Sequence, residues 1–339
     1  MRLTFIGFGT VGQGLAQILL EKGPSLQAVY GFQPVVVAVS DTLKGAVYDP
    51  KGLDLGLLLE VVRDTGRVDA YPRGTKGWDS LQTIRQSNAD VVIEVTTTDL
   101  ETGEPAVSHC KAAFETGKHV ATTNKGPLVV AYRELAQLAA ERGVQFRFEG
   151  TVMSGTPTLR LAVKALAGAE IRRIRGILNG TTNFILTEME AGRSYRAALQ
   201  KAQELGYAEA DPTADVEGWD AAGKTVILAN VLMGSDLKLA DVARQGITGL
   251  TPREIAAARA EGKRWKLIAQ VAREGGRVTA RVRPELLPLS DPLAGVGGVT
   301  NAITFSTDLL GEVTLVGPGA GGRETGFALL GDLLDIHLS

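Results

Sequence analysis

Strand-like and helix-like hydrophobic patterns alternate through the first half of the chain. Arg2 to Ile6 is a short apolar run typical of a strand, and the apolar residues from Val11 to Leu19 recur at helical spacing until Gly23-Pro24, which predicts a helix end. The same patterns predict a second strand at 35–39 and then, after a loop-rich stretch, strands at 90–95, 119–123 and 144–148 and helices at 78–86, 104–115 and 128–142. This alternation predicts a doubly wound, Rossmann-type α/β domain with a parallel sheet over residues 1–150.

The pattern changes after Gly150. Strand-like runs at 171–178, 276–282 and 302–306 are separated by longer helical segments, which predicts a second α+β domain over residues 151–306 for substrate binding and dimerisation. The segment 307–339 contains a strand, a glycine-rich turn and an apolar helix. We expect it to return to the first domain.

Composition narrows the class of protein. The 339 residues carry 36 basic and 38 acidic side chains, so there is no charge footprint for nucleic acid. No apolar run approaches the roughly 18 residues of a membrane span, and the N-terminus lacks a signal-peptide pattern. One cysteine, Cys110, and three histidines offer no zinc cluster and suit a reducing compartment. We therefore expect a soluble, cytoplasmic protein that binds neither membranes nor nucleic acid.

The first candidate site is the motif Gly7-Phe8-Gly9-Thr10-Val11-Gly12, between the first strand and the first helix. In that position glycines allow a tight turn and close approach to a pyrophosphate, which the helix N-terminus attracts. The alternative is a glycine turn that serves packing alone.

The end of the second predicted strand, Ser40-Asp41, is where an adenosine ribose would be bound. Asp41 suits the free 2′-hydroxyl of NAD, whereas Lys44 could meet the 2′-phosphate of NADP, so the sequence leaves the choice open. Thr96 and Thr97, at the next strand end, are further candidates for cofactor contact. Lys125 follows another strand end, where it is either a functional group or a solvated loop charge.

The segment 206–224 contains the highest density of candidate functional residues. It contains five acidic residues, Glu209, Asp211, Asp215, Glu217 and Asp220, and ends at Lys224. Helix capping by Asp215 would explain one carboxylate but not Lys224, which opens an almost wholly apolar helical run. Asp220 and Lys224 are four residues apart and share a helix face. A buried lysine beside a carboxylate suits proton transfer.

Together these segments resemble homoserine dehydrogenase. The family signature combines an alanine, a Gly-aromatic pair, an acidic loop with Asp-Pro, and the pattern Asp-apolar-x-Gly-x-Asp-x-x-x-Lys. The matching positions are Ala202, Gly206, Tyr207, Asp211, Pro212, Asp215, Gly218, Asp220 and Lys224. The motif at residues 7–12, the stretches 122–127 and 180–185 and the terminal Gly-Pro-Gly-Ala-Gly also match, so the resemblance covers nearly the whole chain.

The resemblance implies interconversion of homoserine and aspartate 4-semialdehyde with NAD or NADP, in threonine and methionine biosynthesis. It implies that Lys224 exchanges a proton with the substrate's terminal oxygen, that Asp220 positions Lys224, and that Lys125 is a second active-site lysine.

The resemblance also implies ligand contacts elsewhere. Glu209, with Tyr207 and Asp215, would receive the substrate ammonium, and Gly180 and Thr181 would lie beside it. Gly319 and Gly321 would approach the nicotinamide half of the cofactor. Some family members bind sodium at the stretch 149–156. The corresponding candidates here are Glu149, Val152, Ser154 and Thr156, although an ordinary loop between domains is the alternative.

The family further implies a homodimer formed through the sheet of the second domain. No aspartokinase precedes the matched region and only 18 residues follow Gly321, so the resemblance is to the short, monofunctional form without a regulatory domain. Threonine is therefore not expected to inhibit activity.

Two other functions compete with this interpretation. A phosphorylating semialdehyde dehydrogenase needs a nucleophilic cysteine, but Cys110 falls on the apolar side of the predicted helix 104–115. A non-enzymatic dinucleotide sensor would bind cofactor without turnover and would not need a buried Asp220–Lys224 pair.

Overall fold

The computed structural model describes all residues from Met1 to Ser339, and the chain divides into two units. The first unit combines Met1–Gly155 with Gly321–Ser339, and the second is Thr156–Ala320. These boundaries differ from the expected ones at 150 and 306. Residues 307–320 remain with the second unit because their strand pairs with the strand before it, so only the terminal helix returns to the first unit.

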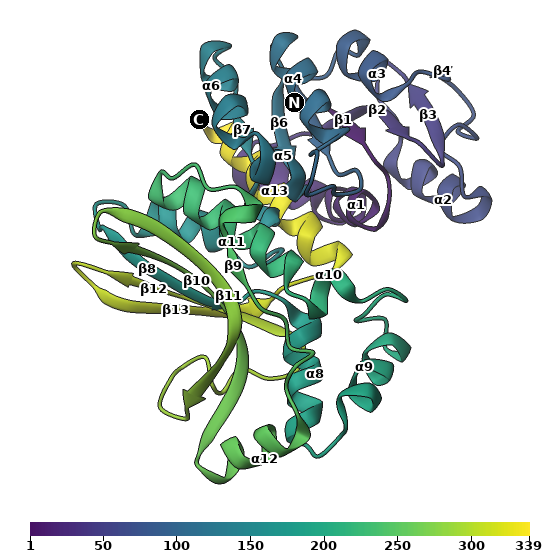
Figure 1. The fold of residues 1–339 in the computed structure, drawn as a ribbon. Coiled ribbons are helices and arrows are strands. Elements are labelled where there is room, and N and C mark those ends of the chain that lie inside the picture. The colour runs from purple at the N-terminus through teal and green to yellow at the C-terminus, as the bar shows by residue number, and fades with distance from the viewer. The chain divides into compact units, whose positions relative to one another are not determined.

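The first unit is built on a seven-stranded sheet (Figure 1). Its strands are β1 (Arg2–Ile6), β2 (Val35–Asp41), β3 (Gly45–Tyr48), β4 (Thr75–Lys76), β5 (Val91–Glu94), β6 (His119–Thr122) and β7 (Phe146–Arg147). They lie in the order β4-β3-β2-β1-β5-β6-β7. The five neighbouring strands β2, β1, β5, β6 and β7 are parallel. The strand order reverses at β1, where doubly wound sheets bind ligands beyond the strand ends.

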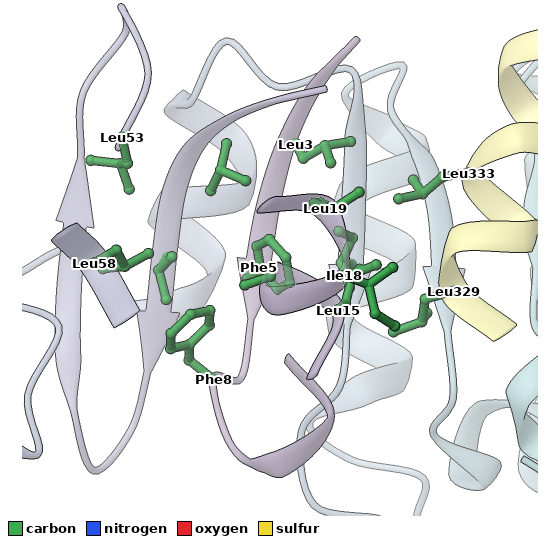
Figure 2. Packing of buried hydrophobic residues seen from close by; sticks show 14 of the residues in the cluster. Leu3, Phe5, Phe8, Leu15, Ile18, Leu19, Leu53, Leu58, Leu329 and Leu333 are labelled. Carbon is green, nitrogen blue, oxygen red and sulfur yellow. The ribbon is translucent and has the colours of Figure 1, made fainter. Parts of the chain in front are cut away.

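Helices cover both faces of this sheet. They are α1 (Thr10–Tyr30), α2 (Leu55–Thr65), α3 (Ser80–Gln86), α4 (Ala106–Glu115), α5 (Lys125–Val130), α6 (Tyr132–Glu141) and α13 (Gly322–Leu338), with a 3₁₀ turn η1 (Glu149–Thr151). Leu3 and Phe5 of β1 pack with side chains of α1, α2 and α13, as Figure 2 shows for Leu15, Leu58 and Leu329. Ile6, on the opposite face, packs with α3, α4 and α6. Alternation along one strand thus divides the core into two layers.

Glycines bring α1 and α13 into direct backbone contact. A Cβ on Gly14 would lie 2.4 Å from the carbonyl oxygen of Gly322, and a Cβ on Gly326 would lie 2.7 Å from the backbone nitrogen of Leu15. The two helices therefore pack side by side although they come from opposite ends of the chain (Figure 1).

The predicted end of the first helix at Gly23-Pro24 is wrong. Helix α1 continues through Pro24 to Tyr30 and ends at Gly31, which adopts a left-handed conformation. Leu26, beyond the proline, is buried in the core with Phe32, and this packing holds the last turns.

Two other predictions for this unit need correction. The loop-rich stretch contains β3, α2 and β4, and the helix predicted at 128–142 is two helices, α5 and α6, separated at Ala131. Ala131 has φ −136° and ψ 20°, which departs from helical dihedral angles and interrupts the helix there.

The second unit contains a six-stranded sheet and its covering helices. Its strands are β8 (Ile171–Ile177), β9 (Ala243–Arg244), β10 (Lys263–Glu274), β11 (Arg277–Pro288), β12 (Thr300–Thr307) and β13 (Gly311–Pro318). Its helices are α7 (Thr158–Arg160), α8 (Gly180–Glu190), α9 (Tyr195–Glu204), α10 (Thr213–Val216), α11 (Trp219–Met233) and α12 (Pro252–Ala260), with short helical turns η2 (Leu161–Ala165) and η3 (Leu239–Asp241).

The order of this sheet is β13-β12-β8-β10-β11-β9, antiparallel except between β11 and β9. Helices α8, α11 and α12 pack against it, which gives the expected α+β architecture. The long strand β10 was not predicted from the sequence. None of the helices in the chain combines the length and apolar character required to cross a bilayer.

Candidate active site

The turn between β1 and α1 has the form that a pyrophosphate requires. Gly7 has φ +93°, and a Cβ there would lie 2.6 Å from the carbonyl oxygen of Val95. A Cβ on Gly9 would meet no atom within 4 Å, so the space over the turn is open. No side chain caps the N-terminus of α1, and its first turn, from Thr10 through Val11 and Gly12, contains no acidic residue. The amide groups and the helix dipole are therefore available to an anion.

Asp41 ends β2 and supports this turn. Its Oδ2 accepts a hydrogen bond from the backbone N–H of Phe8 at 2.7 Å, and its Oδ1 accepts from Leu43 and Lys44, both at 2.9 Å. Burial alone would raise the pKa of Asp41, but these backbone hydrogen bonds hold it below its usual range. Ser40 beside it is buried, and its carbonyl oxygen accepts from Gly7 at 2.8 Å.

A hydrogen-bond network connects the ends of β5 and β6. The side-chain amide of Asn124 donates to the carbonyl oxygens of Thr96 and Thr97, each at 3.2 Å, and its Oδ1 accepts from Gly126 at 2.9 Å. Lys125 is the first residue of α5, directly after Asn124, and is half-buried. The structure thus brings the predicted residues Thr96, Thr97 and Lys125 into one edge of the sheet.

Lys224 has the predicted environment. It lies in α11 with 8% of its surface exposed, and its Nζ donates to Oδ2 of Asp220 at 2.7 Å and to the carbonyl oxygen of Leu178 at 2.6 Å. Asp220 precedes it by one helical turn. An ammonium group has three hydrogens, so two of them fix its orientation and the third remains for a ligand.

Asn179 is a site residue that the sequence analysis missed. It is the N-cap of α8, and its Nδ2 donates to Oδ1 of Asp215 at 2.6 Å and to Oδ2 of Asp220 at 3.0 Å. Asp215 does not cap α11, whose N-cap is Gly218, so the capping interpretation of Asp215 is wrong. The structure instead gathers Asp215, Asp220 and Lys224 around one amide.

The surroundings of Asp215 raise the pKa of its carboxyl group. Burial raises its pKa above the usual range, the hydrogen bond from Asn179 opposes this shift, and the charge of Asp220 adds to it. Perturbed acids of this kind are frequent at functional sites.

Of the remaining predicted substrate residues, Thr181 and Tyr207 adjoin this cluster, and Glu209 follows Tyr207 by two residues. Thr181, in the first turn of α8 after Gly180, donates its hydroxyl hydrogen to the carbonyl oxygen of Tyr207 at 2.6 Å. Tyr207 is 42% exposed, and its ring meets Phe184 edge to face. Glu209 is exposed, and its carboxylate has no hydrogen-bond partner within the chain.

The glycine-rich segment after β13 is tightly fitted. A Cβ on Gly319 would lie 2.1 Å from Cγ of Asn301, within the second unit. Gly321 has φ +128°, and a Cβ there would lie 2.0 Å from Oε2 of Glu324, within the first unit. A side chain at Gly319 would displace Asn301, and one at Gly321 would displace the Glu324 carboxylate and need a backbone conformation that favours glycine.

The predicted cation-binding stretch is buried. Glu149, Val152, Ser154 and Thr156 are each at most 5% exposed, and Met153 and Ser154 adopt positive φ angles of 58° and 53°. Ser154 hydrogen-bonds Thr325 at 2.7 Å, and Thr156 donates to the carbonyl oxygen of Pro318 at 2.9 Å. No group of three or more His, Cys, Asp or Glu side chains is arranged for a metal ion.

Cys110 is a core thiol, as its place on the apolar face of its helix predicted. It is fully buried in α4, and burial raises its pKa well above the usual value, with the charge of Glu94 adding to the shift. A protonated, inaccessible thiol cannot serve as a nucleophile.

A dinucleotide-type turn at a sheet switch point and a buried lysine–carboxylate pair define an oxidoreductase that uses a nicotinamide nucleotide. Comparison with known proteins identifies the family. The model for the NAD-binding domain of homoserine dehydrogenase matches residues 7–149, and the homoserine dehydrogenase model matches residues 157–334.

Individual relatives agree over their full lengths. The chain is 46% identical to the NAD(+)-dependent homoserine dehydrogenase of Pseudomonas canavaninivorans, covering 100% of this chain and 96% of the relative. It is 45% identical to the homoserine dehydrogenase of Methanocaldococcus jannaschii, covering 100% and 99%.

Solved structures show the same fold. A hyperthermophilic archaeal homoserine dehydrogenase in complex with NADPH superposes with a TM-score of 0.85 at 32% identity, covering 99% of this chain and 97% of that one. The homoserine dehydrogenase of Thiobacillus denitrificans gives 0.86 at 31% identity, covering 99% and 73%. The chain belongs to the homoserine dehydrogenase family. It is an NAD(P)-dependent oxidoreductase that interconverts L-homoserine and L-aspartate 4-semialdehyde.

Proposed function

We propose that Lys224 is the group that exchanges a proton with the terminal oxygen of the substrate. When bound, NAD(P) accepts the hydride that leaves the carbinol carbon of homoserine. In that direction the Lys224 amine takes the hydroxyl proton, and in the reverse direction its ammonium returns a proton to the aldehyde oxygen. The observation that carries this proposal is the orientation of Nζ by Asp220 and the Leu178 carbonyl oxygen. It leaves one direction on Nζ for the substrate, which holds the lone pair in the amine and an N–H in the ammonium.

The experiment is steady-state oxidation of homoserine by wild type and by Lys224→Ala. We expect kcat to fall by about 10²–10⁴, the usual contribution of a general acid or base. Lys201→Ala is a matched control because Lys201 also pairs with a carboxylate, Glu188, on the neighbouring helix α8 of the same unit.

The acidic groups near α8 are proposed to bind the amino group of homoserine. Glu209 carries an unpartnered carboxylate, and Asp215 adds a second acid that Asn179 holds in place. Tyr207 and Thr181 are joined by a hydrogen bond and, with Gly180, would form the adjoining wall. An ammonium ion is attracted to carboxylates and donates charge-assisted hydrogen bonds to them.

The strand ends of the first unit are proposed to bind the cofactor. The pyrophosphate would lie on the turn of Gly7, Gly9, Thr10, Val11 and Gly12, which is open above Gly9. Ser40 and Asp41 would contact the adenosine ribose, and Thr96, Thr97 and Lys125 the nicotinamide side. Gly319 and Gly321 are further proposed contacts, since neither carries a side chain that would cover its backbone.

NAD is proposed as the preferred cofactor. Oδ2 of Asp41 accepts a single hydrogen bond, from Phe8, and so retains a lone pair for a ribose hydroxyl. Its lowered pKa keeps the carboxylate ionised, and a negative charge at this position disfavours a 2′-phosphate.

A sodium ion is proposed at the stretch 149–156. One buried carboxylate, Glu149, with backbone and hydroxyl oxygens is a donor set for a hard monovalent cation, and the positive φ angles at Met153 and Ser154 redirect the carbonyl groups there. Val152 and Thr156 complete the proposed set. A higher melting temperature in sodium chloride than in choline chloride is the expected result.

A homodimer is proposed through the sheet of the second unit. Exposed apolar side chains occur on its strands and turns, at Leu286, Leu289, Leu309, Leu310 and Val316. Light scattering should report a dimer for wild type and a smaller species for Val316→Asp.

A reducing cytoplasmic location is proposed from the free, buried Cys110 thiol.

A further inference from the structure

Glu94 is a buried acid without a lysine or arginine partner. It is the last residue of β5, directly beside the β1 turn at the switch point of the sheet, and none of its surface is exposed. Among ionisable side chains, His109 is the one that hydrogen-bonds its carboxylate, with Nδ1 at 3.3 Å from Oε1. Burying a carboxyl group in this way is unfavourable unless hydrogen bonds replace the lost water.

Those hydrogen bonds come from residues at two strand ends. Oε1 accepts from the backbone N–H of Thr96 at 3.3 Å and from the Thr96 hydroxyl. The Thr122 hydroxyl oxygen, at the end of β6, lies 2.8 Å from the Glu94 carbonyl oxygen and 3.3 Å from its Oε2. The Thr122 hydroxyl has a single hydrogen, which it donates to the carbonyl oxygen or to Oε2 of Glu94, and in both cases Glu94 connects the ends of β5 and β6.

The connection continues into the segment that precedes α5. The Thr122 hydroxyl accepts from the backbone N–H of Asn124 at 3.0 Å, and the Asn124 amide in turn donates to the carbonyl oxygens of Thr96 and Thr97. The hydrogen bonds therefore form a closed loop from Glu94 through Thr122 and Asn124 back to Thr96. This loop fixes the backbone on both sides of Lys125.

His109 anchors the carboxyl group from the other side. Its Nδ1 faces Oε1 of Glu94, and its Nε2 lies 2.7 Å from Oγ of Ser80, the first residue of α3. In the tautomer that donates to Glu94, Nε2 accepts the Ser80 hydroxyl hydrogen. His109 is 2% exposed, so both of its bonds are shielded from water.

We propose that Glu94 is a positioning residue for the nicotinamide side of the cofactor, with His109 as its anchor. Through Thr96, Thr122 and Asn124 it holds the Thr96–Thr97 backbone and the start of α5 in the form that the cofactor meets. The inference rests on the proposed function, because that function assigns cofactor contact to Thr96, Thr97 and Lys125.

The test compares Glu94→Ala, Glu94→Gln and His109→Gln with wild type. The affinity for NADH is measured by fluorescence titration, and KM is measured for the cofactor and for homoserine. Glu94→Ala should weaken NADH binding and raise the cofactor KM about tenfold, as expected when hydrogen bonds to a charged group are lost. The KM for homoserine should change little. Glu94→Gln retains one acceptor oxygen and should recover part of the affinity.

Thr83→Val is the matched control. Thr83 is 1% exposed on α3, in the same unit, and its hydroxyl has no hydrogen-bond partner. This variant should bind NADH like wild type. If Glu94→Ala does not fold, the role of Glu94 is tested by comparing the NADH affinities of Glu94→Gln and His109→Gln with that of Thr83→Val.

Thr96→Val distinguishes failure of the Glu94 role from failure of the proposed cofactor contacts. If Thr96→Val weakens NADH binding and folded Glu94 variants bind NADH like wild type, the role of Glu94 is refuted and the proposed cofactor contacts stand. If Thr96→Val also leaves NADH binding unchanged, the proposed contacts fail and the inference fails with them. Weaker NADH binding in both sets of variants, with homoserine KM unchanged, supports the proposal.

Discussion

The Nζ atom of Lys224 lies 2.7 Å from Oδ2 of Asp220, one turn earlier on the buried face of α11. Both side chains are largely shielded, with 10% and 18% of their side-chain surface exposed. A charged lysine in this position requires its partner, because an isolated buried charge is strongly destabilising. Removal of Asp220 would therefore leave the Lys224 charge buried without its ion pair.

Asn179 should be required for more than capping α8. Asn179→Ala removes both the N-cap acceptor and the amide that donates to Asp215 and Asp220, whereas Asn179→Ser keeps a cap but cannot bridge the two acids. We expect Asn179→Ala to lose about 1 kcal/mol of stability and Asn179→Ser to lose little. Both should lower kcat/KM for homoserine by about tenfold, as expected for loss of hydrogen bonds to charged groups. Thermal melts and steady-state kinetics measure the two effects, and full activity of Asn179→Ser would refute the bridging role.

Asp215 should make the protein less stable as pH rises. Burial raises its folded-state pKa above the unfolded value, so the folded protein holds this proton more tightly. That contribution is complete below the unfolded pKa of about 3.9 and is lost as pH rises through the folded pKa. Asp215→Asn, which still accepts from Asn179, should therefore melt higher than wild type at neutral pH and similarly at about pH 4. The same melting temperature difference at both pH values would contradict the assignment.

Glu209 should matter for homoserine and not for the cofactor. Glu209→Gln keeps the size of the side chain but removes the charge that would attract an ammonium group. The KM for homoserine should rise about tenfold, as for a lost charge-assisted hydrogen bond, while the KM for NAD should not change. Glu204→Gln, exposed on α9 in the same unit, is the control and should match wild type. Equal increases in both KM values would instead indicate a structural role for Glu209.

Asp41 should set the preference for NAD over NADP. Like charges about 4 Å apart repel by roughly 1–4 kcal/mol, depending on the local dielectric. Asp41→Asn removes that charge, and its one amide oxygen can accept either from Phe8 or from Leu43 and Lys44. The ratio of kcat/KM for NADP to that for NAD should rise about tenfold. Asp64→Asn, exposed at the end of α2, is the control, and an unchanged ratio in Asp41→Asn would assign the preference to other residues.

The sequence predicted those parts of the molecule that depend on short-range patterns. The strand from Arg2 to Ile6 and the glycine turn after it are local features, and so is the spacing of Asp220 and Lys224 on one helix face. Each was predictable because its cause lies within a few residues.

The failures have long-range causes. Pro24 indicated a helix end, but the burial of Leu26 against a core built from distant strands extends α1 to Tyr30. Helix α2 carried a readable local signal, since Asp54 caps it and Gly66 ends it, but the surrounding loop residues obscured it.

The role of Asn179 belongs to the same class of failure. Its preference for N-cap positions was visible in the sequence, whereas its contacts with Asp215 and Asp220 span 36 and 41 residues. No pattern in a single sequence reports a contact of that separation.

The most direct test of the proton-exchange role of Lys224 is chemical rescue of Lys224→Ala. Homoserine oxidation by this variant is followed through NADH formation while small primary amines are added. We predict that the variant is nearly inactive alone, that its rate rises with amine concentration, and that Lys201→Ala shows no such response. Near-normal turnover by Lys224→Ala without any added amine would contradict the account.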